Sequence, residues 1–185
     1  MAGTKVTEDM IPIGFRFYRD QIARIAREYG LDPALVAAMC WKESAFTSDA
    51  FRFEPDFWNR YLKGNPLYRH LNPRRVSSSY GLMQVMYCRL LEDKIKENDT
   101  AEPETLFLPE VNLRMGCAFF VELQTWAKAR VIPATVSTSP DFIALAAYNG
   151  GRGGNDPAKN WPLKCGRYAA DVLERAAVLR RVWVP

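Results

Sequence analysis

Helix start signals, apolar residues at helical spacing and glycine stops recur along most of this chain of 185 residues. In the segment 32–44, for example, Asp32 suits the N-cap and Pro33 suits the first helical position, and an apolar run follows. Convincing alternating strands are absent. The sequence therefore predicts an all-α, or nearly all-α, fold in one domain over residues 1–185, with long helices over 14–29, 32–44, 109–130, 139–150 and 166–181.

The spacing of apolar residues also predicts which side chains of these helices face inward. In the helix over 109–130 the inward residues are Val111, Met115, Phe119 and Trp126. A shorter helix follows Glu54-Pro55, and its inward residues are Phe57, Tyr61 and Leu62. The segment GLMQVMYCRLLED, residues 81–93, is also predicted to be helical, with Leu82, Val85, Met86 and Leu90 inward.

Composition and charge exclude several classes of protein. With 48% hydrophobic and 25% charged residues, the chain is typical of globular domains. The net charge of +4 is a mild bias towards anionic partners, and acidic residues are interleaved with the basic ones, so we expect no nucleic-acid partner. No apolar run approaches the roughly 18–20 residues of a membrane span. The N-terminus also lacks the apolar stretch and cleavage site of a secretion signal.

The four cysteines are scattered along the chain and form no CxxC pair. Cys40, Cys88 and Cys117 lie in helical patterns, which favours free, buried thiols, although two disulfides are compatible with the sequence. The chain has a single histidine, His70, and no clustered thiols. We therefore expect no zinc site and no other cofactor.

One acidic residue falls on the apolar side of its own helix. Glu43 follows Val36, Met39 and Cys40 by seven, four and three residues, which places all four on one helical face. Carboxylates are seldom buried without a partner, so this placement is unusual. Glu43 is either an ordinary solvent-facing residue beside Lys42 or a carboxyl group whose pKa is raised by an apolar wall, as a general acid requires.

Three fragments stand in a distinctive order: ESAF at 43–46, SSSYGLMQ at 77–84 and ALAAYNGG at 144–151. A tyrosine, Tyr168, follows near the start of the last predicted helix. In this order the fragments resemble the lytic transglycosylases and goose-type lysozymes, which share a lysozyme-like helical fold. The family pattern is Glu-Ser, Gly-Leu-Met-Gln, Ala-Tyr-Asn and then this tyrosine. The resemblance spans roughly residues 18–180.

The chain departs from that family pattern at two places. Ser79 and Tyr80 stand where the family usually has small residues. In addition, 37 residues separate Glu43 from Gly81, which is more than usual and implies an aromatic-rich insertion over about 47–76. Similar insertions, with no signal peptide, are typical of phage- or prophage-encoded members. Such a protein would be made in the host cytoplasm and reach the periplasmic cell wall after holin release or as a virion component.

The resemblance implies a peptidoglycan-degrading enzyme that cleaves the MurNAc–GlcNAc β-1,4 bond. Glu43 would be the single catalytic residue, acting first as acid on the glycosidic oxygen and then as base. In the second step it would take the proton of the MurNAc 6-hydroxyl, which closes onto C1 and gives a 1,6-anhydro sugar without water. The expected partner is the glycan strand, bound by a monomer that is not inserted in a membrane.

The resemblance also implies substrate-binding roles for Ser44, Gly81, Met83, Gln84, Tyr148, Asn149 and Tyr168. Tyr148 would donate its phenol to the Glu43 carboxylate, and Asn149 would fix the turn beneath. Gln84 and the backbone of 81–83 would contact N-acetyl groups, since glycine at 81 permits close approach. Tyr168 would help to hold the saccharide, although a tyrosine at a helix start often only packs.

Glu54 has two interpretations of equal weight. Because it precedes Pro55, it could cap the next helix, or it could enter the cleft as a second carboxylate that binds sugar or positions a water. The second interpretation supports an alternative function, a hydrolytic muramidase in which Glu54 or Asp56 places the water. A non-catalytic peptidoglycan-binding domain is a third alternative.

Overall fold

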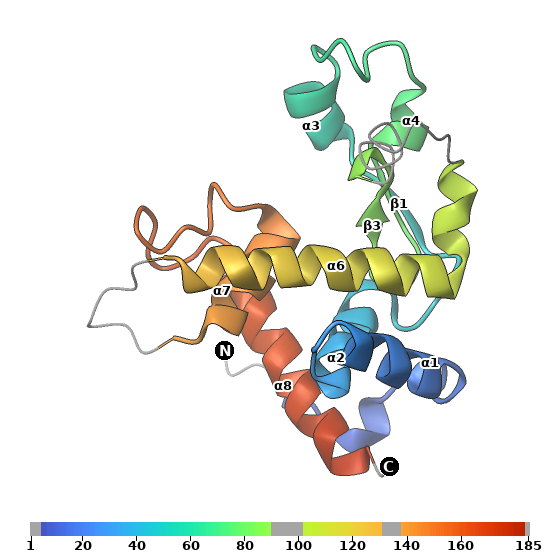
Figure 1. The fold of residues 1–185 in the computed structure, drawn as a ribbon, viewed down its shortest axis with the longest axis vertical. Coiled ribbons are helices and arrows are strands. Elements are labelled where there is room, and N and C mark those ends of the chain that lie inside the picture. The colour runs from blue at the N-terminus through green and yellow to red at the C-terminus, as the bar shows by residue number, and fades with distance from the viewer. Residues whose placement is uncertain (1–4, 90–101, 131–137, 184–185) are drawn as a thin grey trace. The chain divides into compact units, whose positions relative to one another are not determined.

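The computed structural model describes residues 5–89, 102–130 and 138–183, and helices dominate them (Figure 1). The nearly all-α fold class predicted from the sequence is therefore confirmed. The chain divides into two compact units, unit 1 (Met1–Lys42 and Cys117–Pro185) and unit 2 (Glu43–Gly116). The predicted single domain over residues 1–185 stays a prediction.

Unit 1 contains the long helices, and local sequence signals set their ends. Its elements are η1 (Glu8–Met10), α1 (Phe15–Glu28), α2 (Pro33–Ser44) as far as Lys42, α6 (Pro109–Lys128) from Cys117, α7 (Pro140–Gly150) and α8 (Gly166–Val182). The Asp32 carboxylate accepts a 2.9 Å hydrogen bond from Ala34 N, and the Ser139 hydroxyl caps α7 at 3.2 Å from Phe142 N. Beyond α1 lies Gly30, whose φ of 68° only glycine adopts readily. The predicted start and stop signals are confirmed.

The core of unit 1 is apolar, and α7 packs against α8 within it. On α6 the fully buried residues of this unit are Cys117, Phe120, Leu123 and Ala127. The predicted inward residues Phe119 and Trp126 are only half-buried. The predicted face is therefore wrong by one position, because aromatic size drew the assignment to large residues that lie at the edge of the core.

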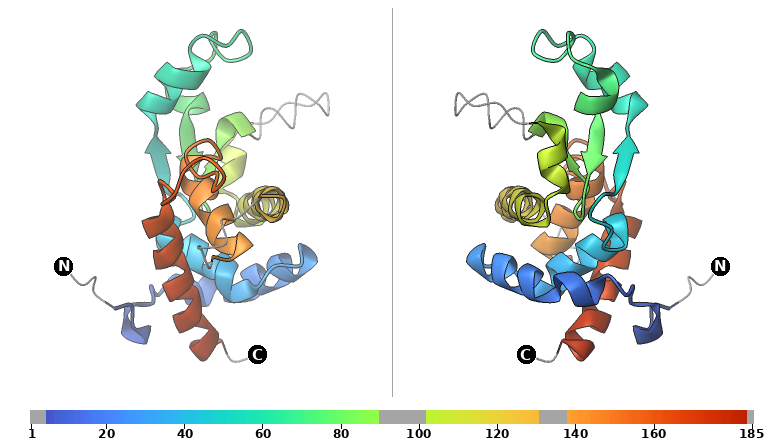
Figure 2. Two further views of the ribbon diagram at one scale, coloured as in Figure 1. Left: turned by 90° about the vertical axis from the view of Figure 1, so that its left-hand side faces the viewer. Right: turned by 90° about the vertical axis from the view of Figure 1, so that its right-hand side faces the viewer.

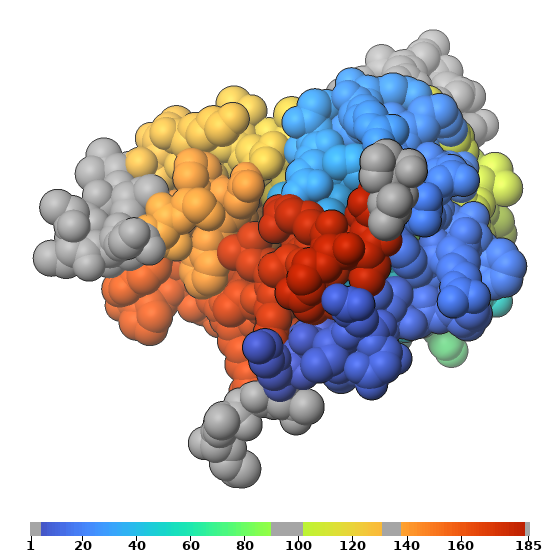
Figure 3. Space-filling model, turned by 90° about the horizontal axis from the view of Figure 1, so that it is seen from below, coloured from blue at the N-terminus to red at the C-terminus, as the bar shows by residue number. Residues whose placement is uncertain are grey.

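The N-terminal segment, residues 5–13, lies against the last turns of α8 (Figure 3). Val6 N donates a 2.9 Å hydrogen bond to the Glu174 carboxylate, and Arg181 Nε lies 3.2 Å from Glu8 Oε1. The rings of Phe15 and Trp183 meet edge to face with centroids 5.2 Å apart. These contacts fix the start of the described chain to its end.

Unit 2 is built on a three-stranded antiparallel sheet, which the sequence did not predict. The strands β1 (Phe51–Phe53), β2 (Ser78–Tyr80) and β3 (Val85–Met86) lie in the order β1-β2-β3. The predicted helix over 81–93 is wrong for 81–86, residues 87–89 are helical, and residues 90–93, with the predicted inward Leu90, lie outside the described residues. Residues 81–84 instead turn the chain from β2 into β3, since φ is 71° at Gly81 and 49° at Gln84, values that no right-handed helix contains.

The predicted insertion, about 47–76, includes β1, and its larger part lies between β1 and β2; this part, called the insertion below, contains α3 (Pro55–Phe57), the π-helical turn η2 (Trp58–Leu62) and α4 (Pro73–Val76). Within unit 2, these elements lie beyond one end of the strands (Figures 1 and 2). Leu62, Tyr68, Val76 and Cys88 form a small core of their own. Tyr61 is 57% exposed, so its predicted inward position is wrong. The wider π-helical turn, closed by Lys63 N to Trp58 O at 2.9 Å, shifts the phase of the helix and turns Tyr61 outward.

Across the described parts of the chain, no helix combines the length and the apolar character needed to cross a bilayer.

Candidate functional site

The apolar stripe of α2 leads to Glu43, as the sequence predicted. Val36, Met39 and Cys40 are fully buried, and Glu43 is half-buried at the C-terminal end of the same helix. This placement puts the carboxyl group at the boundary between core and solvent. Such a position leaves a carboxyl group partly accessible to a ligand.

Left-handed backbone conformations cluster around the two predicted motifs of unit 2. Ala45, Phe46 and Gln84 have φ values of 50°, 62° and 49°, and within the described ranges no other residue except glycine has a positive φ. Each such residue costs on the order of 1–3 kcal/mol, and conformations of this kind gather at functional sites. Two of them follow the Glu43–Ser44 pair directly, and the third ends the 81–84 turn.

The hydroxyl of Ser44 connects these two motifs. Ser44 Oγ donates a 2.8 Å hydrogen bond to the carbonyl oxygen of Leu82. Since Ser44 adjoins Glu43, this bond holds the end of α2 to the 81–84 turn. The predicted contact of Ser44 with the saccharide stays a prediction.

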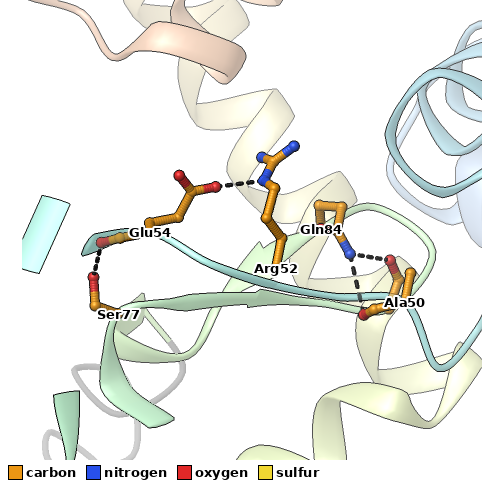
Figure 4. A network of polar contacts seen from close by, with 6 residues as sticks. Ala50, Arg52, Glu54, Ser77 and Gln84 are labelled. Atoms are coloured by element: carbon orange, nitrogen blue, oxygen red, sulfur yellow. Dashed lines mark hydrogen bonds and ion pairs between the residues drawn. The ribbon is translucent and has the colours of Figure 1, made fainter. Parts of the chain in front are cut away.

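The 81–84 turn is also tied to Ala50, the residue before β1. Gly81 N donates to Ala50 O at 2.8 Å, and Gln84 Nε2 donates to Ala50 O at 3.2 Å and to Gly81 O at 3.0 Å (Figure 4). The amide group of Gln84 is thereby fixed on its own turn. Met83 is fully buried beside Gly116, which places its side chain in the core of unit 2.

Asn112, on α6, supports the turn from inside and was missed in the sequence. It is fully buried, and its Oδ1 accepts a 2.8 Å hydrogen bond from Met83 N. Its Nδ2 donates to Tyr80 O at 2.7 Å and to Leu106 O at 2.8 Å. The sequence does contain a signal for it. Asn112 lies on the same helical face as the buried residues Leu113, Gly116 and Cys117, and a polar side chain on a buried face needs hydrogen-bond partners, as Glu43 does on α2.

At Gly81 the backbone lies in close contact with other parts of the protein, namely Leu106 and Asn112. A Cβ atom at this position would lie 2.5 Å from Leu106 O and closer still to Asn112 Nδ2. Because φ is also 71°, the site requires glycine for two independent reasons. Packing thus accounts for glycine at 81 in this structure, and the predicted contact of Gly81 with a ligand stays a prediction.

Glu54 occupies the N-cap position of α3, yet its side chain makes no capping hydrogen bond, so the capping interpretation is wrong. Its carboxylate pairs with Arg52 Nε (Figure 4). Its backbone is bound to Ser77 in both directions, with Glu54 N to Ser77 O at 2.8 Å and Ser77 Oγ to Glu54 O at 2.7 Å. Glu54 thus closes the end of the β1–β2 pair from which the insertion emerges.

In unit 1, a charged network holds the last turn of α2. Lys42 and Arg175 both bind the carboxylate of Asp171 on α8, and the Arg175 guanidinium lies 4.6 Å from the centre of the Trp41 ring. Burial raises the pKa of Asp171, but the hydrogen bonds and charges of Lys42 and Arg175 outweigh it and lower the pKa overall. This network fixes the residue that directly precedes Glu43.

The Ala-Tyr-Asn fragment ends α7, and aromatic rings hold its tyrosine. The half-buried Tyr148 ring packs on Phe119 and Phe120 of α6, with centroids 5.2 and 6.4 Å away. Tyr168 is half-buried in the first turn of α8. The predicted hydrogen bond from Tyr148 to Glu43 and the predicted saccharide contact of Tyr168 stay predictions.

The turn after α7 is held by side-chain hydrogen bonds of Asn155. Asn149 is exposed, and its side chain makes no hydrogen bond with the described residues. Asn155 is fully buried, donates to Gly151 O at 2.8 Å and accepts from Cys165 N at 2.8 Å. The side-chain contacts that hold this turn are thus those of Asn155, and the predicted roles of Asn149 in fixing the turn and binding the substrate stay predictions.

Comparison with known proteins gives a consistent result. The family model described as the transglycosylase SLT domain matches residues 20–161, which is more than half of the chain. Membrane-bound lytic murein transglycosylase C of Edwardsiella ictaluri (strain 93-146) is 29% identical over 141 residues, which cover 74% of this chain and 32% of that protein. The chain thus spans about a third of the length of this curated relative.

Two solved structures have a similar fold. An inactive mutant of the lytic transglycosylase Slt from Pseudomonas aeruginosa superposes with a TM-score of 0.60 at 22% identity, over 91% of this chain and 25% of the other. The 70 kDa soluble lytic transglycosylase from Escherichia coli gives a TM-score of 0.59 at 18% identity, over 89% of this chain and 24% of the other. The matched family model, together with the motifs located above, shows that the chain belongs to the transglycosylase SLT domain family.

Proposed function

We propose that this chain cleaves the MurNAc–GlcNAc β-1,4 bond of peptidoglycan as a lytic transglycosylase, with Glu43 as its single acid and base. The observation that carries the proposal is the position of Glu43, half-buried at the end of a fully buried apolar stripe and two residues before the left-handed backbone of Ala45 and Phe46. Membership of the SLT domain family supports the same reaction.

In the first step, the protonated Glu43 carboxyl donates its proton to the glycosidic oxygen, and the bond from that oxygen to C1 of MurNAc breaks. In the second step, the resulting carboxylate takes the proton of the MurNAc 6-hydroxyl, whose oxygen forms the new bond to C1. One proton leaves Glu43 and one returns, so the enzyme ends the cycle as it began. The leaving group is the GlcNAc 4-hydroxyl, and no water is consumed.

Two of the predicted binding residues receive support from their surroundings. Gln84 Nε2 is occupied by Ala50 O and Gly81 O, so the amide oxygen is the end that would accept an N-acetyl N–H. The Tyr148 ring is held by two phenylalanines, which would keep its phenol in a fixed position for donation to Glu43. Ser44 would act through the 81–84 turn and not by its own contact with sugar.

The hydrolytic alternative requires a second group that positions water. The Glu54 carboxylate is bound by Arg52, which disfavours that role.

The proposed substrate places the site of action at the cell wall. Delivery by a holin or a virion, a phage origin and a monomeric state stay predictions.

Substitution of the two glutamates tests the proposal. Purified peptidoglycan would be treated with the wild type, with Glu43→Gln and with Glu54→Gln, and the release of soluble fragments would be measured. We expect a loss of at least about a hundredfold for Glu43→Gln, which is the range of general acid catalysis, and little loss for Glu54→Gln. Wild-type activity of a folded Glu43→Gln protein would refute the proposal, and a comparable loss for both Glu43→Gln and Glu54→Gln would favour the muramidase.

A further inference from the structure

The positive charge of this protein is concentrated in one short part of the insertion. Residues 57–75 contain five Lys and Arg residues and no Asp or Glu, a net charge of +5. The rest of the chain has 20 basic and 21 acidic residues, a net charge of −1. The whole positive excess of the protein therefore lies in 19 residues of unit 2.

Four of these five cations are exposed residues of this short segment that make no ion pair with a carboxylate of the described residues, and we call them together the basic surface: Arg60, Lys63, Arg69 and Arg74. Within the described ranges, these four make no ion pair. The fifth cation, Arg75, is paired with Glu102 and Glu104. A protein with so many ion pairs elsewhere leaves its most cationic segment uncompensated, which favours an anionic ligand.

The basic surface also presents exposed apolar groups. Tyr61 is 57% exposed and Leu67 is 39% exposed. The Tyr61 ring packs on Phe57 at 5.0 Å between centroids, and the Arg60 guanidinium lies 5.9 Å from its centre. Since Tyr61 is held by these neighbours, it offers a fixed aromatic face next to free positive charge. This combination fits a ligand that carries both carboxylates and small apolar groups.

The sheet connects this surface to the predicted glycan site in the same unit. At one end of the β1–β2 pair, Ala50 binds Gly81 and Gln84. At the other end, Glu54 and Ser77 close the pair, and the insertion begins there (Figure 4). Three strand residues span about 10 Å, so the insertion starts roughly that far from the 81–84 turn. A ligand that binds the turn and carries side branches could reach the insertion.

We propose that the basic surface, with Tyr61, binds the peptide stems of peptidoglycan, so that the protein prefers stem-bearing glycan to stripped glycan. Peptide stems carry free carboxylates and the methyl groups of alanine, which match the two kinds of group described above. This inference rests on the proposed function, because it assumes that the glycan strand itself occupies the 81–84 turn. The insertion is then a specificity element for the substituted polymer.

The test compares binding to two glycans that differ only in their stems. Full-length protein carrying Glu43→Gln, to prevent turnover, would be titrated with soluble glycan strands that retain their stems and with strands from which an amidase has removed them. We expect about tenfold tighter binding to stem-bearing strands, since each exposed ion contact contributes about a twofold gain. The preference should shrink at high salt, where exposed charges are screened.

A matched pair of variants assigns the preference to the basic surface. Arg60→Gln/Lys63→Gln/Arg69→Gln/Arg74→Gln should lower the affinity ratio between the two glycans to about one. The control Lys5→Gln/Arg16→Gln/Arg27→Gln/Lys128→Gln removes the same charge from exposed positions of unit 1 and should keep the ratio. Circular dichroism would show that both variants are folded.

Three outcomes would overturn the inference. One is an equal affinity of the parent protein for both glycans, and another is an equal loss of the ratio in the control variant. The third is a basic surface that is needed for binding to phosphatidylglycerol vesicles or DNA but not for the glycan preference. Wild-type cleavage of stripped strands, measured separately, reports on the proposed function alone, so the two failures are distinguishable.

Discussion

Replacement of Asn112 by alanine tests how the 81–84 turn is held. The change removes the partners of three backbone groups, namely Met83 N, Tyr80 O and Leu106 O. A buried polar group left without a partner costs about 1–3 kcal/mol. With water admitted to the small space left by the amide, we take the lower end for each group and expect a loss of about 3 kcal/mol. That is a large part of the roughly 5–15 kcal/mol that stabilises a domain.

The assay is urea unfolding followed by circular dichroism, with Gln124→Ala as the control. Gln124 is also an amide on α6, but it makes one side-chain hydrogen bond, at 2.7 Å to Asp141 Oδ1. We expect it to lose about 1 kcal/mol. If Asn112→Ala loses no more stability than Gln124→Ala, Asn112 does not hold the turn and the description of the site is wrong.

Three further predictions concern stability. Gly81→Ala should cost at least about 2 kcal/mol in urea unfolding, because of its φ and its contact with Asn112, whereas Gly64→Ala, which meets nothing within 4 Å, should change it by less than about 0.5 kcal/mol. Asp171→Asn should cost about 1 kcal/mol at neutral pH. Because the folded pKa of Asp171 is lowered, its contribution is present above the ordinary pKa and is lost as pH falls through the folded value, so the wild type and Asp171→Asn should converge in acid. Burial, above all, raises the pKa of Tyr80 to about 12, so the free energy of unfolding of the wild type should fall by about 2 kcal/mol between about pH 10 and 12. Tyr80→Phe should not show this fall, and equal alkaline unfolding curves for the two proteins would contradict the prediction.

The helices of this protein were predictable because their signals are local. Asp32, Ser139 and Gly30 act on residues within four positions of themselves, and the structure uses each of them as the sequence predicts. The apolar stripe before Glu43 is likewise a property of one helix, so its burial followed from spacing alone.

The parts that were not predictable depend on distant partners. The sequence Gly-Leu-Met-Gln is compatible with the start of a helix, but hydrogen bonds that it donates to Ala50 and Asn112 hold it as a turn between strands. No local pattern announces a partner 29 residues away. The turn after α7 depends in the same way on Asn155, which binds Gly151 and Cys165. Of the two interpretations of Glu54, the capping one is wrong because the carboxylate pairs with Arg52, and the cleft interpretation stays a prediction.

The mass of the reaction product tests the proposed chemistry of Glu43 most directly. Stem-bearing glycan would be digested by the wild type in water labelled with heavy oxygen, and the new ends would be analysed by mass spectrometry. If Glu43 accepts the proton of the MurNAc 6-hydroxyl and that oxygen bonds to C1, the product is one water lighter than a hydrolysis product and carries no label. A labelled reducing end would show that water attacks C1, and the single-carboxylate account would be contradicted.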